Sequence, residues 1–461
     1  MKKKSFLFIA FCLALCLVPS IGMLFFPTTE STENKAMSEV PKLIENGKIN
    51  KLFFQDCGEY FNDHIALRNE MIFVDAKIQT KLFSESNVSG VIYGENDWLY
   101  YSSTLDDYLG RNQMSERELY NLSHNISIIQ DYLDKLNIDF IFTIPPNKNT
   151  LYDENMPYHS TDKVNAEHNA KRLEAYLEEA NIKYLDLFDL FENQDETLYL
   201  LRDSHWNMKG ACLAYNNIMD SLKIKHNDYS ETPPVIEKKT EGDLNKMLYS
   251  IYGEPEENYN YNLPMNYSYK NKVNGVEDGW IITENQMGKG TLLMFRDSFA
   301  DTLIPFISNE FRTAYYSKGL PNALERYIED DKPDCVVMEK VERNITDYLN
   351  TPPIITPATT ELPDNITIAT TDSTVTIEEC LYDAEYYVIS GILDSERVED
   401  NSDIVVCVND KLYKAYHIEE YGYILYLKKS EFENKSISLD VYSVNDDNCI
   451  RLLSSIIDSI N

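Results

Sequence analysis

The 461-residue chain carries 42 lysines and arginines against 76 aspartates and glutamates, which gives a formal net charge of -34. This length is sufficient for two or three domains with separate apolar cores. Because a strongly acidic protein repels phosphate backbones and anionic headgroups, the charge argues against a nucleic-acid partner and against lipid binding through a basic surface.

Residues 1–27 are predicted to form a membrane segment. Lys2, Lys3 and Lys4 precede a run from Ser5 to Phe26 that contains no charged residue. Such a run can cross a bilayer at about 1.5 Å per residue, with its positive end in the cytoplasm. Because no small-x-small cleavage pattern follows it, we favour an uncleaved signal anchor over a cleaved secretory signal. Either alternative exports the rest of the chain, which would work at the outer face of the cytoplasmic membrane or in the cell envelope.

Residues 28–50 are predicted to be a polar connector. Apolar residues then recur at helical spacing from Phe53 to Phe83, which predicts one or two helices ending near Ser84. Two short apolar runs between Gly90 and Tyr101, separated by turn residues, predict a hairpin.

Helical patterns then alternate with apolar runs that are too short for helices. The predicted helices are 116–136, 164–180, 210–222 and 324–328, and the predicted strands are 138–144, 182–187, 291–295 and 335–341. This alternation predicts an α/β domain at 51–350 with a parallel sheet between layers of helices. Residues 226–285 have weak periodicity and are predicted to form an irregular excursion. Functional groups gather at the carboxyl ends of such strands. The polar segments 145–148, 203–205 and 296–298 all follow apolar runs.

The C-terminal part differs in composition. Residues 351–364 are rich in proline and threonine and are predicted to be a linker. Short β-prone runs at even spacing between 365 and 461 predict a β-sandwich, a candidate carbohydrate-binding module. The eight cysteines form no C-x-x-C pair, which argues against a zinc site, so we expect no metal and no cofactor. Export leaves open a disulfide between two of Cys380, Cys407 and Cys449.

A Ser-His-Asp set emerges from the polar segments. A serine is a weak nucleophile and needs a hydrogen-bonded base that a third group orients. Asp203 and His205, two residues apart, supply a base and its carboxylate. Ser298 follows the predicted strand 291–295, where a turn would raise its hydroxyl above the sheet, beside backbone N–H groups that can stabilise an oxyanion. Each residue alone is an ordinary turn or cap residue, but together they predict a nucleophile, a general base and its orienting acid.

Two segments carry a resemblance to a known family: Arg-Asp-Ser-His-Trp-Asn at 202–207 and Phe-Arg-Asp-Ser-Phe-Ala-Asp at 295–301. They resemble the SGNH hydrolase-like O-acetyltransferases of the alginate type (AlgX/AlgJ-like) and the related bacterial DHHW proteins, over about residues 46–343. The resemblance implies an SGNH-like (flavodoxin-like) three-layer fold in which Asp203 and His205 precede the serine, a permuted order relative to ordinary SGNH esterases. It also implies an acetyl-enzyme on Ser298, with the acetyl group delivered by a membrane-bound O-acyltransferase.

Four further residues are candidates for the substrate or oxyanion site. Asn147 follows a predicted strand and would be an oxyanion donor or a turn residue. Arg296 stands where the family often has glycine, and it would crowd or polarise the oxyanion site. Trp206 would wall the acyl pocket, stack on a sugar or pack at the core edge. Lys148 would point into the cleft or lie in a solvated loop, which we favour.

These observations predict an exported enzyme that transfers an acetyl group to a hydroxyl of an extracytoplasmic cell-envelope polysaccharide. One alternative is a carbohydrate esterase that uses the same three residues with water as acceptor. Another is a non-catalytic envelope protein that binds glycan.

Overall fold

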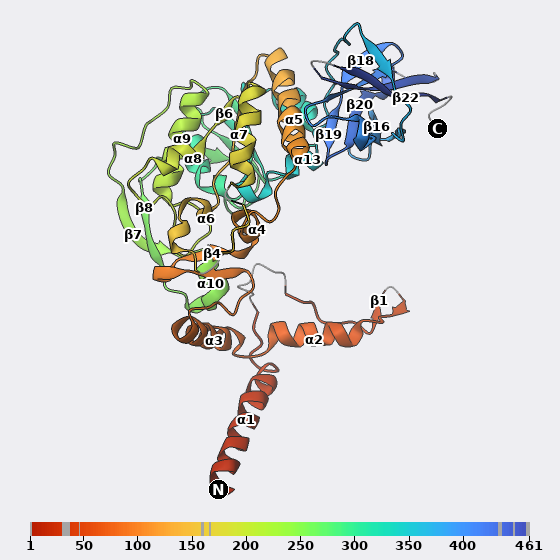
Figure 1. Ribbon diagram of the computed structural model, residues 1–461. Helices are drawn as coiled ribbons and strands as arrows, with labels where there is room; N and C mark the ends of the chain where they lie inside the picture. Colours follow the sequence, from red (N-terminus) through yellow and green to blue (C-terminus); the bar gives the residue numbers. More distant parts are fainter. Residues whose placement is uncertain are drawn as a thin grey trace.

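The computed structural model describes residues 2–29, 37–45, 47–157, 161–165, 167–431, 436–445 and 448–457. From the N-terminus, an apolar helix leads to a two-helix corner, which carries an α/β body, and a β module lies beside the body at the C-terminal end (Figure 1). The connector predicted at 28–50 lies partly outside the described residues.

The predicted membrane segment forms α1 (Lys2–Gly22), which the structure leaves largely exposed. Among the described residues, its stretch Lys3–Gly22 is the helix that is long and apolar enough to cross a membrane. Length and composition alone fit either a signal anchor or a signal peptide.

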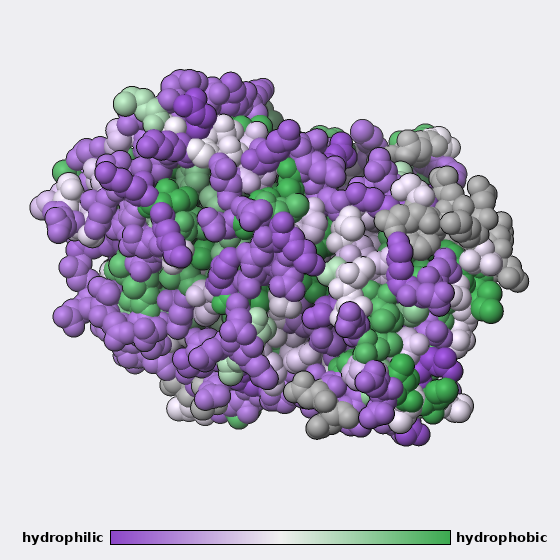
Figure 2. Space-filling view, turned by 90° about the horizontal axis from the view of Figure 1, so that it is seen from above, coloured by the Kyte–Doolittle hydropathy of each residue, from purple (hydrophilic) through white to green (hydrophobic). Residues whose placement is uncertain are grey.

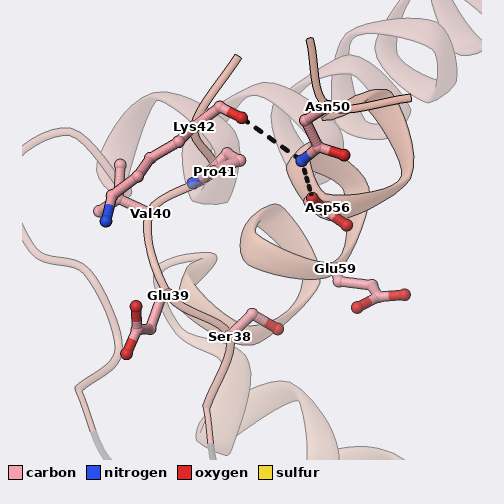
Figure 3. Close-up of a pocket in the computed structure, with 8 residues that line it drawn as sticks. All are labelled: Ser38, Glu39, Val40, Pro41, Lys42, Asn50, Asp56 and Glu59. Atoms are coloured by element: carbon pink, nitrogen blue, oxygen red, sulfur yellow. Dashed lines mark hydrogen bonds between the residues drawn. The ribbon is translucent and has the colours of Figure 1, made fainter. Parts of the chain in front are cut away.

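The predicted helical stretch after the connector forms α2 (Phe53–His64) and α3 (Arg68–Phe83), separated by a corner at Leu67, whose φ is 62°. The short hairpin of β1 (Ile44–Glu45) and β2 (Lys48–Ile49) precedes α2. The Asn50 side-chain amide donates to the carbonyl oxygen of Lys42 (3.3 Å) and to the carboxylate of Asp56 (2.6 Å), which closes a small polar pocket against α2 (Figure 3). This pocket contains none of the predicted site residues.

The predicted hairpin is present as β3 (Val91–Tyr93) paired with β4 (Leu99–Tyr101). The body also contains a mixed sheet whose strand order is β6-β5-β13-β11-β12-β10-β9. Strands β6, β5, β13, β11 and β12 pair in parallel, whereas β10 and β9 are antiparallel additions from the excursion 226–285. The bounds are β5 (Asp139–Thr143), β6 (Tyr184–Leu185), β9 (Ser268–Tyr269), β10 (Trp280–Glu284), β11 (Thr291–Phe295), β12 (Thr313–Ser317) and β13 (Cys335–Glu339).

Helices bury both faces of this sheet, which is why its strands read as continuous apolar runs. Alternate residues of β5, β11 and β13 pack on opposite sides, Leu293 and Phe295 on one and Leu292 and Met294 on the other. The first side is covered by α5 (Glu116–Lys135), α7 (Asn169–Glu179), α12 (Leu324–Asp331) and α13 (Asp347–Asn350). The second is covered by α8 (Leu187–Glu192), α9 (Met208–Ser221) and α11 (Ile304–Ile307). The remaining elements of the body are α4 (Leu105–Tyr108), α6 (Lys148–Leu151), α10 (Asp243–Tyr249), β7 (Val235–Thr240) and β8 (Glu256–Asn260).

The strand predicted at 182–187 and the helix predicted at 164–180 were both too long. The strand predicted at 182–187 is only β6, because the Asp186 side chain accepts from the N–H groups of Phe188 and Asp189 and starts α8. The helix predicted at 164–180 begins later, at Asn169.

The C-terminal module consists of two sheets, ordered β14-β22-β21-β17-β18 and β15-β16-β20-β19. Its apolar core lies between them. The β-prone runs in the sequence, at 374–377, 386–392, 404–408, 423–427 and 437–444, correspond to β15, β16, β17, β20 and β21. The other strands, β14, β18, β19 and β22, were missed because most are short or carry polar residues. The bounds are β14 (Ile366–Ile368), β15 (Thr376–Glu379), β16 (Tyr386–Ile392), β17 (Asp403–Val408), β18 (Lys411–Lys414), β19 (Tyr416–Ile418), β20 (Gly422–Lys428), β21 (Ile437–Val444) and β22 (Cys449–Ile457).

The predicted linker is packed rather than free. Ile354 and Ile355 are buried, and the Thr356 N–H donates to the carboxylate of Glu325 on α12. The segment predicted as a linker thus contains no named helix or strand, and it packs against the body. All eight cysteines are free thiols, so the disulfide left open among Cys380, Cys407 and Cys449 does not form in this structure.

Buried polar groups join the module to α5. The Asn125 side chain donates to the carbonyl oxygen of His417 (2.7 Å) and accepts from its N–H (2.9 Å), so that it pairs with β19 as a neighbouring strand would. The His124 and His417 rings stack at 4.1 Å, and Arg117 donates to three carbonyl oxygens of the loop 399–402. These contacts fix the module to the body.

Replacing Asn125 by alanine should lower the free energy of unfolding by about 2–4 kcal/mol, because two buried backbone groups of His417 lose their partners. A urea titration measures this change. Asn217→Ala is the matched control, since Asn217 donates only to the carbonyl of its own helix, and it should cost less than about 0.5 kcal/mol. Equal effects of the two substitutions would contradict the proposed role of the interface.

Candidate active site

Ser298 lies in the turn that follows β11, and the neighbouring strand β13 holds this turn. The Asp297 N–H donates to the carboxylate of Glu339 (2.8 Å), and the Asp297 carboxylate accepts from the N–H groups of Phe299 (2.9 Å) and Val341 (2.8 Å). Burial, together with the charge of Asp297, raises the pKa of Glu339 well above its ordinary value. Ser298 begins a short 3₁₀ turn, and its backbone N–H has no acceptor in the part of the chain that the structure describes.

The Asp203-Ser204-His205 segment lies in a tight loop rather than after a sheet strand. Tyr199 pairs with Trp206 in an isolated antiparallel bridge, and the N–H of Leu200 donates to the carbonyl of His205 (3.2 Å). The Asn207 side chain caps α9 by accepting from Lys209 and Gly210. The apolar run 198–201 therefore folds back on 205–207, and this return places His205 opposite Ser298.

The structure brings the three residues of the predicted set into one chain of hydrogen bonds. The Ser298 hydroxyl lies 2.8 Å from Nε2 of His205, and Nδ1 of His205 lies 2.7 Å from Oδ1 of Asp203. A carboxylate can only accept, so the ring proton belongs on Nδ1, and Nε2 is left to accept from the hydroxyl. The side chains of His205 and Asp203 are 22% and 13% exposed, so a substrate can reach them. This is the geometry that activation of a serine requires.

The charges in this set of hydrogen-bonded residues shift the pKa values of His205 and Asp203 in opposite directions. Burial lowers the pKa of His205, but the hydrogen bond and charge of Asp203, with the charge of Asp243, raise it above the ordinary value. Burial raises the pKa of Asp203, but the hydrogen bond and charge of His205 and two backbone N–H donors lower it below the ordinary value. Asp203 is thus ionised whenever His205 is neutral, as an orienting carboxylate must be.

Asp243, at the start of α10, is a site residue that the sequence prediction missed. Its carboxylate accepts from the N–H and hydroxyl of Ser204, and its own N–H donates to Asp203 Oδ2 (2.9 Å). Its Oδ2 lies 3.7 Å from Nδ1 of His205. The adjacent Gly242 permits this approach, because a Cβ there would lie 2.2 Å from the carbonyl oxygen of Arg202. In the sequence, the only indication of this role is a Gly-Asp pair before a helical pattern. Such a pair does not show which loop the aspartate contacts.

Asp203, His205 and Asp243 offer ligand atoms within 4.8 Å of one another, a separation that could suit a metal ion. However, Nδ1 of His205 and both carboxylates already have hydrogen-bond partners within the loop. The same groups therefore serve to orient the imidazole.

The favoured prediction for Lys148 was wrong, because the structure buries this side chain. Its ammonium group donates to the carbonyl oxygens of Leu99 (2.8 Å), Leu201 (2.7 Å) and Asp203 (2.9 Å) and lies over the rings of Trp98 and Tyr100. Burial lowers the pKa of Lys148 to about 7. Lys148 thus ties the hairpin β3–β4 to the loop that carries Asp203 and His205. The sequence could not show this, since the acceptors are backbone carbonyls brought together by the fold.

Arg296 and Trp206 are also turned away from the serine. The Arg296 guanidinium is buried and donates to the carbonyl oxygens of Val276 (2.8 Å) and Asp278 (2.9 Å), and it pairs with Asp301. Arg296 therefore holds the loop 276–278 and does not crowd an oxyanion. The Trp206 indole is buried, and its N–H donates to the Thr302 hydroxyl, which leaves no face for a sugar.

Asn147 lies near the site but does not contact Ser298 in this structure. Its amide donates to Asp107 (3.1 Å) and accepts from Arg343 (3.3 Å). The Arg343 guanidinium lies 5.8 Å from the Phe299 ring centroid, and its charge acts on His205. Arg343 is therefore a cation near Phe299 and His205. It is the last residue of the family resemblance, but no sequence motif marked it as a site residue.

Residues 91–273 match the family model described as SGNH hydrolase-like domain, acetyltransferase AlgX. The predicted resemblance is thereby confirmed over this segment, which contains Asp203 and His205 and ends before Ser298. No curated protein sequence matches the chain.

Three solved structures are similar in parts. PatB1 of Bacillus cereus has 20% identity over 55% of this chain and 96% of its own, with a TM-score of 0.44. A DHHW family protein of Eubacterium siraeum has 15% identity over 49% and 85%, with a TM-score of 0.39. The O-acetyltransferase domain of Pseudomonas putida AlgJ has 18% identity over 56% and 92%, with a TM-score of 0.36.

Asp203→Asn should lower kcat/KM for nitrophenyl acetate by about 10⁴-fold, because the imidazole loses the carboxylate that fixes its tautomer. It should also move the acid limb of the pH–rate profile. The base works as neutral imidazole, so activity falls as pH drops through the pKa of His205, which Asp203 raises. Removing that charge moves the limb to lower pH. Asp243→Asn should move it in the same direction by less, and a limb that stays in place in both variants would contradict the assignment.

Lys148→Met should lower kcat/KM by about 10²-fold, because three carbonyls lose their shared donor and the loop of Asp203 and His205 shifts. The acid limb should stay where it is, since His205 keeps its partner. Lys163→Met, which removes a partly exposed lysine paired with Asp153, is the control and should keep full activity. A folded Lys148→Met protein with wild-type activity would show that the loop does not need this cation.

Proposed function

We propose that the chain is an exported serine O-acetyltransferase that transfers an acetyl group to a hydroxyl of an extracytoplasmic cell-envelope polysaccharide. The hydrogen-bond chain from Ser298 through His205 to Asp203 is the observation that carries this proposal. The family match over residues 91–273 supports acetyl transfer as the chemistry. The net charge of -34 favours a neutral glycan over a phosphorylated substrate.

In the proposed reaction, the Ser298 oxygen attacks the acetyl carbonyl while Nε2 of His205 takes the hydroxyl proton. The oxyanion is stabilised by the Ser298 N–H and by the nearby Arg343 guanidinium. Collapse of the intermediate breaks the bond to the donor, whose leaving oxygen receives the proton from His205. A sugar hydroxyl then gives its proton to His205 and attacks the acetyl-serine. The acetylated sugar leaves, and His205 returns a proton to the Ser298 oxygen.

The N-terminal helix is proposed to remain as an anchor. Its C-terminal end is part of the fold: the Ala66 N–H donates to the carbonyl of Pro19 (3.3 Å), and the Thr28 N–H donates to the carbonyl of His64 (3.2 Å). An anchored enzyme would receive its acetyl group from a membrane-bound O-acyltransferase partner. The proposed units are the anchor 1–27, the connector 28–50, the catalytic domain 51–350, the linker 351–364 and the module 365–461.

The module could hold the glycan. A groove of about 920 Å³ runs between it and α13. The hydroxyl, amide and ring groups that line it suit a neutral sugar; they include Asn350, Thr376, Ser390, Tyr421 and Tyr423.

The esterase alternative uses the same geometry, since water can reach a histidine that is 22% exposed. A non-catalytic glycan-binding protein is the other alternative, and it leaves the 2.8 Å contact between Ser298 and His205 without a purpose.

Cells that lack the native protein should lose acetylation of their envelope polysaccharide and should recover it with the wild-type chain but not with Ser298→Ala. Serine at 298 is partly exposed, so the variant is expected to fold. Normal acetylation by Ser298→Ala would contradict the enzymatic proposal. With purified protein, added oligosaccharide should divert acetyl groups from water to sugar. If the release of acetate stays the same when oligosaccharide is added, the esterase alternative is favoured.

A further inference from the structure

Helix α3 is apolar on two opposite faces. One face carries Phe73, Ala76 and Thr80, and it packs on α10, where Ala76 is fully buried and the Phe73 and Tyr249 rings are in contact. The other face carries an apolar stripe at the spacing of one helical face. Its members on α3 are between 41% and 72% exposed: Met71, Val74, Ile78 and Leu82. Leu67, which directly precedes α3, is 49% exposed.

The stripe points away from the body. Successive residues of a helix are turned by about 100°, which places Met71, Val74 and Ile78 nearly opposite Ala76 and Thr80. Charged residues border the stripe, with Arg68 and Asp75 on one side and Lys77 and Lys81 on the other. A contiguous exposed apolar face with a charged border is typical of a surface that contacts something.

The stripe begins where α1 ends. Ala66 is in contact with Gly22, and Leu67 lines the same recess as Val18, Gly22 and Phe26. Figure 1 shows α1 running away from the body at this corner while α3 lies across its direction. A helix that leaves a bilayer at Gly22 therefore puts α3 at the level of the headgroups. By contrast, the face on the far side of the body from α1 is mostly hydrophilic (Figure 2).

We propose that α3 lies in the outer surface of the membrane and inserts Leu67, Met71, Val74, Ile78 and Leu82 among the lipids. The chain is too acidic for attraction to anionic headgroups, so apolar burial must drive this contact. The long side chain of Lys81 at its edge can reach back to the headgroups, whereas the Lys77 ammonium lies over the Tyr249 ring and Arg68 donates to the carbonyl of Asn62. The inference rests on retention of α1 as an anchor but not on the acetyl-transfer chemistry.

Docking of α3 orients the active site. Helix α10 packs on α3 with one face, and its first residue, Asp243, binds Ser204 and Asp203. The loop of Asp203 and His205 is thus joined to the membrane surface through two packed helices. This arrangement holds the site at a fixed height above the bilayer, where a membrane-bound donor could reach it.

Tryptophan quenching tests the proposal. Val74→Trp and Leu82→Trp would be made in the full chain, which would be reconstituted as one copy per nanodisc of phosphatidylcholine brominated in its acyl chains. Emission from each new indole, after subtraction of the wild-type signal, should fall by roughly half relative to unbrominated lipid, as expected for a ring about 5–10 Å below the headgroups. High salt should not restore it, since the contact is apolar. Leu136→Trp is the control, because Leu136 is also exposed but directly follows α5, a helix that lies far from α1 (Figure 1), and it should not be quenched.

Quenching at Val74→Trp and Leu82→Trp but not at Leu136→Trp supports the proposal. Retention of the chain in the disc without quenching at either position would overturn it and leave the anchor intact. Quenching that appears only with two copies per disc would also overturn it, in favour of a contact between copies. Extraction of the chain by alkaline carbonate would overturn the anchor and the docking together, whereas loss of acetyl transfer with quenching intact would affect only the proposed function.

Discussion

The hydrogen bond between the Ser298 hydroxyl and Nε2 of His205 joins two loops whose residues lie 93 positions apart in the sequence. A misplacement of about 1 Å at such a contact can cost two orders of magnitude in rate. Each loop is therefore held from the side away from the substrate: Asp297 is fixed on β13, and Asp203 is fixed by Asp243 and Lys148. The chemistry proposed for the site depends on this contact more than on any other.

Two residues that hold the site loops, Lys148 and Arg296, are buried and charged, and each has several hydrogen-bond partners. Lys148 is nearly fully buried and has three carbonyl acceptors, and Arg296 is buried with three carbonyls and one carboxylate. A buried charge is tolerated only when its hydrogen bonds are made. Removing one partner is therefore expected to disturb the whole loop. In the proposed reaction, these residues act through position rather than by contact with substrate.

Local features of the sequence predicted the three residues that the structure joins by hydrogen bonds, because a D-x-H pair and a strand followed by a serine turn are both contiguous patterns. The supports could not be predicted in this way. Lys148 has the sequence context of a loop lysine, and only the fold brings the carbonyls of Leu99 and Leu201 to it. Asp243 lies in a segment with weak periodicity. The same reason applies to the fold: β5, β11 and β13 are buried on both faces and stand out as apolar runs, whereas β6 is short and β19 carries a histidine that pairs with α5.

The proposed mechanism predicts an acetyl-serine at one place in the chain. Treatment with an activated acetyl ester, rapid acid quenching and peptide mass spectrometry measure this directly. The wild-type protein should carry one acetyl group on the peptide that contains Ser298, and His205→Ala should carry none at the same time of exposure. An acetyl group on another residue, or equal labelling of Ser298 in both proteins, would contradict the account.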